Sequence, residues 1–272
     1  MSGTRSIPHF AQLCRYACCL PMAVLVASIL ILASPVQAEE QSARKILKAM
    51  ATYLANEAVI TATYDSDIEV ITPALQKIQF TNSGEVTIRR PDRLVAKRAG
   101  GYSHVEMIFD GATATILGRH NNTYAQIKAP GSIDDLIHRL RDEFSVSIPG
   151  ADLLLAGAYD ELIADATEIK HIGHGVIEGR ECDHLAFRGG EVDWQLWVEI
   201  GPNPIPRKYV ITSKSVAGSP QYTLRIKSLT TASPASSDAF SFKVPQGATL
   251  VDVKSLADID EVPAGLVAGA VQ

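Results

Sequence analysis

The stretch ITATYDSDIEV, residues Ile60–Val70, alternates two kinds of side chain. Its even-numbered positions are mostly apolar, while its odd-numbered positions carry only threonine, aspartate and glutamate. Successive side chains of a β-strand point to opposite faces, so this alternation predicts a half-buried strand of about twelve residues. The even-numbered face is expected to turn toward the interior of the fold.

Short runs of strand-forming residues continue along the chain, and turn sequences separate them. Directly after the first strand, Ile78–Phe80 and Val86–Ile88 flank Asn82–Gly84, which is a hairpin signal. Further runs lie between residues 105 and 127 and between residues 185 and 229. Many strands joined by tight turns predict one large antiparallel sheet.

Helical spacing appears at the start of the chain and again in its middle. A leading helix is expected after Ser42, a capping residue, because the apolar residues of 46–54 recur on one helical face. A central helix is expected to begin with the capping pair Ser132 and Asp135. Shorter apolar helical pieces follow it, the first at Leu153–Leu155.

A sheet of about ten strands twists and coils, so it cannot stay flat. The leading and central helices are the available covers for its open side. The sequence therefore predicts an α+β fold, a curled antiparallel β half-barrel (an incomplete barrel) with a helical lid that encloses an apolar cavity. The expected cavity-lining residues on the strands are Ile60, Ala62, Ile68, Val70, Val86 and Ile88, and those on the lid helices are Leu136, Leu140, Leu153 and Leu154.

One charged residue continues the apolar face of a predicted strand. Arg90 is in phase with Val86 and Ile88, and Pro91 follows it. If the pairing is regular, the guanidinium points inward and needs hydrogen-bond acceptors there, such as backbone carbonyls or a carboxylate. If the strand has ended by Pro91, Arg90 is solvated instead. The strand pattern by itself leaves both alternatives open.

The first 38 residues have the features of a secretory signal peptide. Arg5 and Arg15 are the charged residues before Glu39, and Met22–Leu32 is a strongly apolar run. The small residues at Val36–Ala38 match a signal-peptidase site. We therefore expect cleavage after Ala38 and a periplasmic protein, with an uncleaved N-terminal anchor as the alternative.

The remaining sequence lacks recognisable catalytic or nucleotide-binding motifs. A net charge of −5 argues against nucleic-acid binding, which requires a basic face. His171 and His174 could in principle bind zinc, together with Cys182 and His184. In a regular strand, however, His171 and His174 point to opposite faces. We therefore expect no metal, no cofactor and no catalytic residue, and a protein that is not an enzyme.

Four motifs together resemble those of a known family. The motifs are Val86–Leu94, Phe109–Thr113, Trp197–Lys208 and Asp238–Ala248. They occur in the order and at the spacing of the outer-membrane lipoprotein carriers of the LolA type, to which the LolB and RseB types are related. The sequence is identified as a member of a predicted periplasmic family of unknown function (domain of unknown function 2092) that is related to these carriers, rather than as a carrier proper.

The resemblance implies that residues 39–252 form one carrier-like domain. Residues 253–272 are rich in Ala, Gly, Val and Asp without a clear period, so we expect a loose C-terminal tail there. The resemblance also implies an incomplete barrel with a helical lid over an apolar cavity. In the carriers, an inward arginine latches the lid by bonding lid carbonyls, and that position matches Arg90 here. The carriers put aromatic residues where this chain has Ala114–Ile116, and their helical insert is shorter. The resemblance therefore leaves the cargo open.

Two functions follow from the resemblance. The first is a non-enzymatic periplasmic carrier or chaperone that holds acyl chains of a lipoprotein or lipid in the cavity. The alternative is an envelope sensing or regulatory module that binds a partner protein on the same fold. A monomer with no nucleic-acid partner is expected in either case.

Overall fold

The computed structural model describes residues 35–144, 146, 148–231, 237–255 and 266. The chain divides into two compact units, residues 1–33 and 34–272, and the fold is that of the second unit. The predicted signal peptide, residues 1–38, lies outside the described residues up to position 34. The predicted loose tail also lies outside them after Ser255, apart from Leu266.

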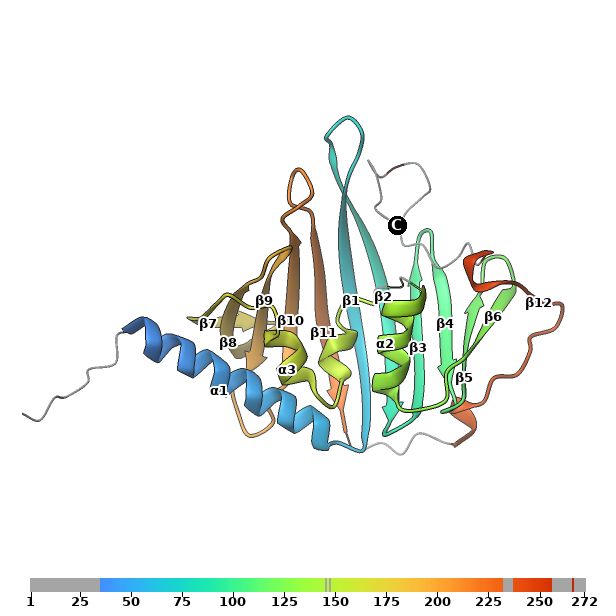
Figure 1. The fold of residues 1–272 in the computed structure, drawn as a ribbon, viewed down its shortest axis with the longest axis horizontal. Helices are drawn as coiled ribbons and strands as arrows, with labels where there is room; N and C mark the ends of the chain where they lie inside the picture. Colours follow the sequence, from blue (N-terminus) through green and yellow to red (C-terminus); the bar gives the residue numbers. More distant parts are fainter. Residues whose placement is uncertain (1–34, 145, 147, 232–236, 256–265, 267–272) are drawn as a thin grey trace, which may run out of the picture. The chain divides into compact units, whose positions relative to one another are not determined.

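Within the described residues, twelve strands form one sheet in the order β12-β6-β5-β4-β3-β2-β1-β11-β10-β9-β8-β7 (Figure 1). Neighbouring strands are antiparallel, except that β12 runs parallel to β6. The two edge strands do not pair with each other, so the sheet stays open. The prediction of a large, curled, unclosed antiparallel sheet with few helices is confirmed. The strands are β1 (Val59–Ile71), β2 (Lys77–Arg89), β3 (Arg93–Gly100), β4 (His104–Phe109), β5 (Thr113–Gly118), β6 (Thr123–Lys128), β7 (Glu168–Ile177), β8 (Arg180–Arg188), β9 (Val192–Glu199), β10 (Pro206–Ser213), β11 (Gln221–Thr230) and β12 (Thr249–Leu250).

The strand predicted from the alternating stretch is β1, and it lies in the middle of the sheet. It pairs along its whole length with β2 and, on its other side, over Thr61–Ile68 with β11. Its pairing with β2 aligns Ile60 with Ile88 and Ala62 with Val86, so apolar side chains meet on one face. This central pairing joins the two halves of the sheet.

The hairpin predicted at Asn82–Gly84 is wrong, because β2 runs straight through these residues. Gly84 lies opposite Tyr64 of β1, and a Cβ atom on Gly84 would lie 2.3 Å from Cζ of that ring. The glycine therefore makes room for a large cross-strand neighbour. The chain turns instead between β1 and β2 at Thr72–Gln76, where the backbone N–H of Thr72 donates to the carbonyl of Gln76 over 2.9 Å.

The leading helix, α1 (Pro35–Asn56), packs against β7 and β9 (Figure 1). It begins seven residues before Ser42, so the capping role expected of Ser42 is wrong. Its buried face consists mainly of Ala43, Leu47, Met50 and Leu54, as helical spacing predicts. No helix in the described part of the chain is both long enough and apolar enough to cross a membrane.

Three helical pieces connect β6 to β7: α2 (Ile133–Phe144), the 3₁₀ helix η1 (Ala151–Leu154) and α3 (Ala158–Ile163). The predicted cap of α2 is confirmed. The backbone N–H of Ser132 donates to the Asp135 carboxylate over 2.8 Å, and the backbone N–H of Asp135 donates to Ser132 Oγ over 3.1 Å. The hydrogen bonds that the backbone N–H and the hydroxyl of Ser132 donate to this carboxylate hold the pKa of Asp135 below its ordinary value.

The described part of the segment after β11 packs against β3 and β6. It contains the 3₁₀ helix η2 (Ser237–Phe240), β12 and the 3₁₀ helix η3 (Val253–Ser255). Phe240 is 2% exposed, and the Arg89 guanidinium lies over its ring at 4.9 Å from the centroid. The tail that was expected to be loose from residue 253 onward thus begins with a helical turn, η3.

Candidate ligand-binding cavity

A cavity of about 530 Å³ lies between the sheet and the central helices. Its walls are mainly aliphatic, and Lys97 and Arg98 are the charged residues that line it. The strands contribute residues from β1 to β5, from β10 and from β11. The opposite wall comes from α2, η1 and the connection between them. That wall includes Leu136, Ile137, Leu140, Val146, Ile148, Leu153 and Leu154.

The six strand residues expected to line the cavity occupy two kinds of position. Ala62, Ile68 and Val86 are among its lining residues. Ile60 and Ile88 face each other, are fully buried and belong to the packed core. Val70 is 6% exposed and lies near the C-terminal end of β1. Like Ile60 and Ile88, it is not among the residues that line the cavity. The four leucines expected on the lid helices all line the cavity: Leu136, Leu140, Leu153 and Leu154.

Sequence reasoning missed the walls that β3–β5 and β11 contribute. Leu94 and Ala96 alternate along β3, and Leu224 and Ile226 alternate along β11. The same period of two that identified β1 is present in both strands. Whether these strands reach the cavity, however, depends on pairing between strands that are distant in sequence, such as the pairing of Leu224 in β11 with Ser66 in β1.

Arg90 connects the end of β2 to both helical regions. Its Nη2 donates to the carbonyl oxygen of Leu154 in η1 over 2.7 Å, and it lies 3.5 Å from the carbonyl oxygen of Leu54 in α1. Its own backbone N–H donates to the carbonyl of Ala58 over 2.9 Å. Burial lowers the pKa of Arg90, and the nearby Asp134 carboxylate opposes this shift. An arginine nevertheless stays charged in a protein, so these carbonyls receive a charge-assisted hydrogen bond.

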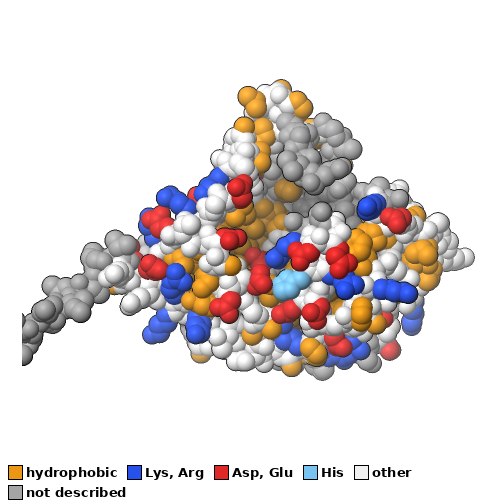
Figure 2. Space-filling model, viewed as in Figure 1, with side chains coloured by type: hydrophobic (Ala, Val, Ile, Leu, Met, Phe, Trp, Pro, Cys, Tyr) orange, Lys and Arg blue, Asp and Glu red, His pale blue; other side chains and the backbone are white. Residues whose placement is uncertain are grey.

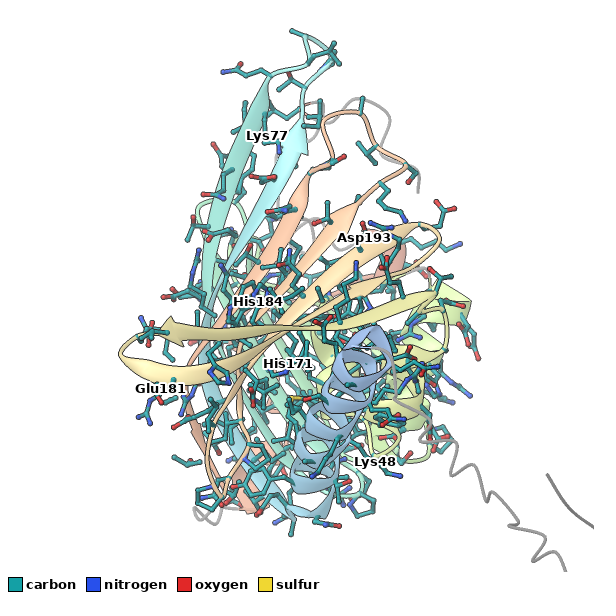
Figure 3. The ribbon with its side chains drawn as sticks, turned by 90° about the vertical axis from the view of Figure 1, so that its left-hand side faces the viewer. Lys48, Lys77, His171, Glu181, His184 and Asp193 are labelled. Carbon is teal, nitrogen blue, oxygen red and sulfur yellow. The ribbon has the colours of Figure 1, made fainter. Side chains whose placement is uncertain are left out.

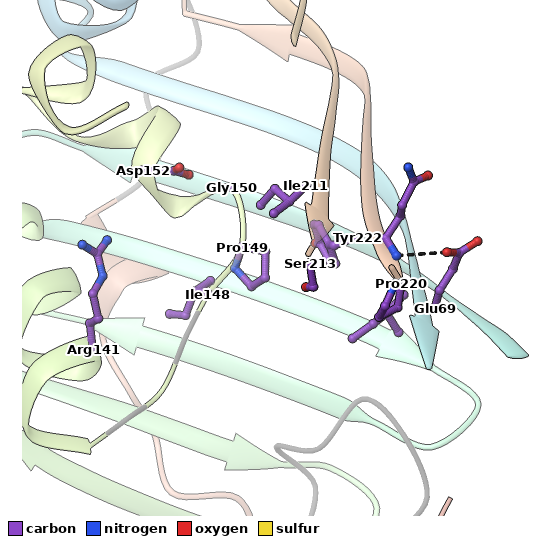
Figure 4. Close-up of a pocket in the computed structure, with 12 residues that line it drawn as sticks. Glu69, Arg141, Ile148, Pro149, Gly150, Asp152, Ile211, Ser213, Pro220 and Tyr222 are labelled. Carbon is purple, nitrogen blue, oxygen red and sulfur yellow. Dashed lines mark hydrogen bonds between the residues drawn. The ribbon is translucent and has the colours of Figure 1, made fainter. Parts of the chain in front are cut away.

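A second hollow of about 450 Å³ adjoins the first (Figure 4). The two share Ile68, Tyr222 and the segment Ile148–Gly150, so this segment borders both spaces. The second hollow is more polar and includes Glu69, Arg141 and Asp152 in its wall. On the face shown in Figure 2, hydrophobic side chains gather in a hollow below the projecting β1–β2 hairpin, and charged side chains surround it.

Asp152 is a buried carboxyl group at the junction of η1 and the second hollow. Tyr209 Oη donates to its Oδ2 over 3.0 Å, while its Oδ1 is buried without a hydrogen-bond partner among the described residues. Burial raises the pKa of Asp152, and this effect outweighs the hydrogen bond from Tyr209. Burial, reinforced by the Asp152 carboxylate, also raises the pKa of Tyr209 well above 10.0. The phenol therefore remains a donor at neutral pH.

The histidines of β7 are arranged differently from the expectation. His171 and His174 were expected on opposite faces of a regular strand, and this is wrong. A β-bulge shifts the register between His171 and Gly173, so both imidazoles lie beside Asp183 of β8. Their Nε2 atoms are 3.0 Å and 3.4 Å from Asp183 Oδ1. Cys182 is not part of this group and is fully buried, and burial raises the pKa of its thiol.

Several solved structures are similar to the chain at low identity. LprF from Mycobacterium bovis shares 11% identity, with a TM-score of 0.44 and coverage of 76% of this chain and 97% of that one. The Pseudomonas aeruginosa MucA/MucB complex shares 12% identity, with a TM-score of 0.41 and coverage of 74% of this chain and 61% of that one. The LolA superfamily protein NE2245 from Nitrosomonas europaea shares 10% identity, with a TM-score of 0.33 and coverage of 74% of this chain and 97% of that one. No curated protein sequence matches the chain.

The family comparison covers most of the sequence. A family model matches residues 43–254, from the first buried turn of α1 to η3. The match includes every strand of the sheet and all three central helical pieces. It agrees with the family and the periplasmic location expected from the sequence motifs. The chain belongs to the family described as predicted periplasmic protein (DUF2092), and it is a periplasmic protein.

Proposed function

We propose that this protein is a non-enzymatic binding protein that holds acyl chains of a lipoprotein or lipid in the apolar cavity. The observation that carries the proposal is the cavity of about 530 Å³ with its aliphatic walls. Its volume falls in the range of small-molecule binding sites, roughly 300–1,000 Å³. Of the charged residues in its lining, Lys97 is paired with Glu85 over 2.6 Å, and the Arg98 guanidinium suits an anionic or polar group at the end of the acyl chain.

Burial of methylene groups would provide the affinity. Each buried CH₂ contributes about 0.8 kcal/mol, so ten methylenes contribute roughly 8 kcal/mol before the costs of binding. The loss of translational and rotational freedom consumes several kcal/mol of this amount. Binding by an acyl chain would then be reversible, as a carrier or chaperone requires.

In this proposal, α2 and η1 form the lid. Both are attached to the same end of β2. The backbone N–H of Ile133, at the start of α2, donates to the carbonyl of Pro91 over 2.8 Å, and Arg90 holds the carbonyl of Leu154 at the end of η1. The far side of the lid is the segment Ile148–Gly150, which borders both hollows. We therefore expect the lid to open on that side, while the attachments at Arg90 and Pro91 act as its hinge.

Displacement of a fluorescent fatty acid tests this function. The protein should bind the probe at micromolar concentration, and an unlabelled long-chain fatty acid should displace it. A short-chain acid of the same charge should not displace it, because the methylenes supply the affinity. Absence of saturable probe binding, in protein first stripped of lipid by organic extraction, would contradict the proposal.

A second candidate is a module that binds a partner protein. The observation in its favour is the edge strand β7, on which Ile172 is 53% exposed and Val176 is 66% exposed. An edge strand with exposed apolar side chains can accept a strand from another chain. Ile172→Lys and Val176→Lys should abolish the capture of such a partner and leave fatty-acid binding unchanged. The opposite result would favour the cavity.

A further inference from the structure

We propose that His171, His174 and Asp183 form a binding site for a divalent transition-metal ion, for which Zn²⁺ is the test ion. Each residue offers one ligand atom, and these atoms all lie within 4.8 Å of one another. The group lies on the β7–β8 hairpin against α1, and none of its members lines the apolar cavity (Figure 3). The site is therefore independent of the proposed acyl-chain binding.

The β-bulge in β7 creates the group. His174 lies directly opposite Asp183, which a regular ladder would also allow. His171 reaches the same side because the register shifts before Gly173, whose φ of 124° is a conformation that favours glycine. Bulges redirect side chains in this way, and here the redirection brings a second imidazole to the same carboxylate.

The distances approach those of a coordinated ion. In a tetrahedral zinc site with bonds of about 2.0–2.1 Å, neighbouring ligand atoms are roughly 3.3 Å apart. The two distances from Nε2 to Asp183 Oδ1 are 3.0 Å and 3.4 Å, which already match. The remaining distance, between the two imidazole nitrogens, is at most 4.8 Å, and rotation of the His174 side chain, which is 70% exposed, would shorten it.

Ser42 supplies the outer contact that metal-binding histidines usually have. Its Oγ lies 3.2 Å from Nδ1 of His171. A hydroxyl group can either donate or accept, so it fits both tautomers of the ring. With a metal on Nε2, Nδ1–H would donate to Ser42 Oγ and so fix the orientation of the ring.

The ligand set selects the class of ion. Two imidazole nitrogens and one carboxylate oxygen suit zinc and related transition metals, whereas magnesium and calcium prefer oxygen ligands throughout. Three protein ligands also leave coordination positions for water or for a ligand from outside. The His171 and Asp183 side chains are 19% and 18% exposed, so the ion would reach the site past His174.

Titration of the untagged, exported protein with ZnCl₂ in a calorimeter tests the site. We expect saturable binding of one ion per chain, no comparable binding of Mg²⁺, and a rise of the thermal unfolding midpoint in zinc. His174→Ala should weaken zinc binding at least tenfold, and its exposed position should leave the fold intact. Asp183→Asn, which preserves the side-chain shape, should have a similar effect.

The matched control is His138→Ala. His138 also lies beside a carboxylate, with Nε2 at 3.3 Å from Glu161 Oε1, but within the described part of the chain it belongs to no group of three possible metal ligands. This variant should bind zinc as the wild type does. The ¹⁵N imidazole spectrum adds a direct readout, because zinc should move the Nε2 signals of His171 and His174. The proposal is overturned if zinc does not bind, if His174→Ala leaves binding unchanged, or if both rings keep an Nε2–H that merely donates to Asp183 in saturating zinc.

Discussion

The Arg90 guanidinium and the Leu154 carbonyl oxygen, 64 residues apart in sequence, are joined by a hydrogen bond of 2.7 Å. The bond connects the end of a central strand to the helical segment over the cavity. At the next residue along the chain, the carbonyl of Pro91 accepts a hydrogen bond from the first residue of α2. Two adjacent residues thus hold both ends of the proposed lid.

Arg90→Leu should loosen the lid without unfolding the sheet. A charge-assisted hydrogen bond contributes roughly 1.5–3 kcal/mol. We expect faster amide exchange in residues 136–144 and 151–155, unchanged protection in β1 and β2, and faster ligand release. Hydrogen exchange followed by mass spectrometry measures this directly.

The control for that variant is Arg89→Leu. The Arg89 guanidinium lies over Phe240 and not over the lid, and such a contact contributes about 0.5–1 kcal/mol at a partly exposed site. Its loss should raise exchange near residues 238–240 and leave the lid protected. If both variants loosen the same segment, Arg90 is not a latch.

Ala96→Phe should fill part of the cavity and compete with its ligand. Ala96 lines the cavity from β3, whereas Ala99 on the same strand is exposed. We expect fatty-acid affinity to fall by at least tenfold in Ala96→Phe and to stay unchanged in Ala99→Phe. Circular dichroism checks that both variants fold. Equal affinities in the two variants would place the ligand elsewhere.

Asp152→Asn should make the protein more stable at neutral pH. Because burial raises the pKa of Asp152 above its ordinary value of 3.8, the folded state retains a proton that the unfolded state loses. The wild type therefore loses stability as the pH rises from about that value through the raised pKa. Asparagine carries no charge and still accepts the Tyr209 hydrogen bond. Urea unfolding from pH 4 to pH 8 should show a flatter profile in the variant, and identical profiles would contradict this assignment.

Gly84→Ala should destabilise the centre of the sheet. The added Cβ would meet the Tyr64 ring and lie 2.6 Å from the carbonyl oxygen of Lys97. Overpacking of this kind costs about 1–3 kcal/mol. Because the ring is one of the two obstacles, Tyr64→Ala should offset part of the loss, with a coupling of roughly 0.5–3 kcal/mol in a double-mutant cycle. Strict additivity of the two free-energy changes would show that ring and glycine do not interact.

Local signals predicted the elements of the fold that depend on neighbours in sequence. The alternation of Ile60–Val70 predicted β1, and the pair Ser132 and Asp135 predicted the start of α2. The same local reasoning misread Asn82–Gly84 as a turn, because the reason for Gly84 is the Tyr64 ring on another strand.

The candidate sites were less predictable, because pairing between distant strands assembles them. Leu224 and Ile226 reach the cavity through the pairing of β11 with β1. The imidazoles of His171 and His174 lie beside the same carboxylate only because of the β-bulge before Gly173. The glycine between the two histidines was the one feature of the sequence that could have indicated this bulge. Residue types and spacing do not specify such a shift of register.

Mass spectrometry of organic extracts from protein purified from its own periplasm tests the central claim most directly. The proposed function predicts an acyl-bearing molecule in near-stoichiometric amount, present in Ala99→Phe and strongly reduced in Ala96→Phe. An extract without acyl chains from the wild-type protein, together with a protein partner whose capture depends on Ile172 and Val176, would contradict it.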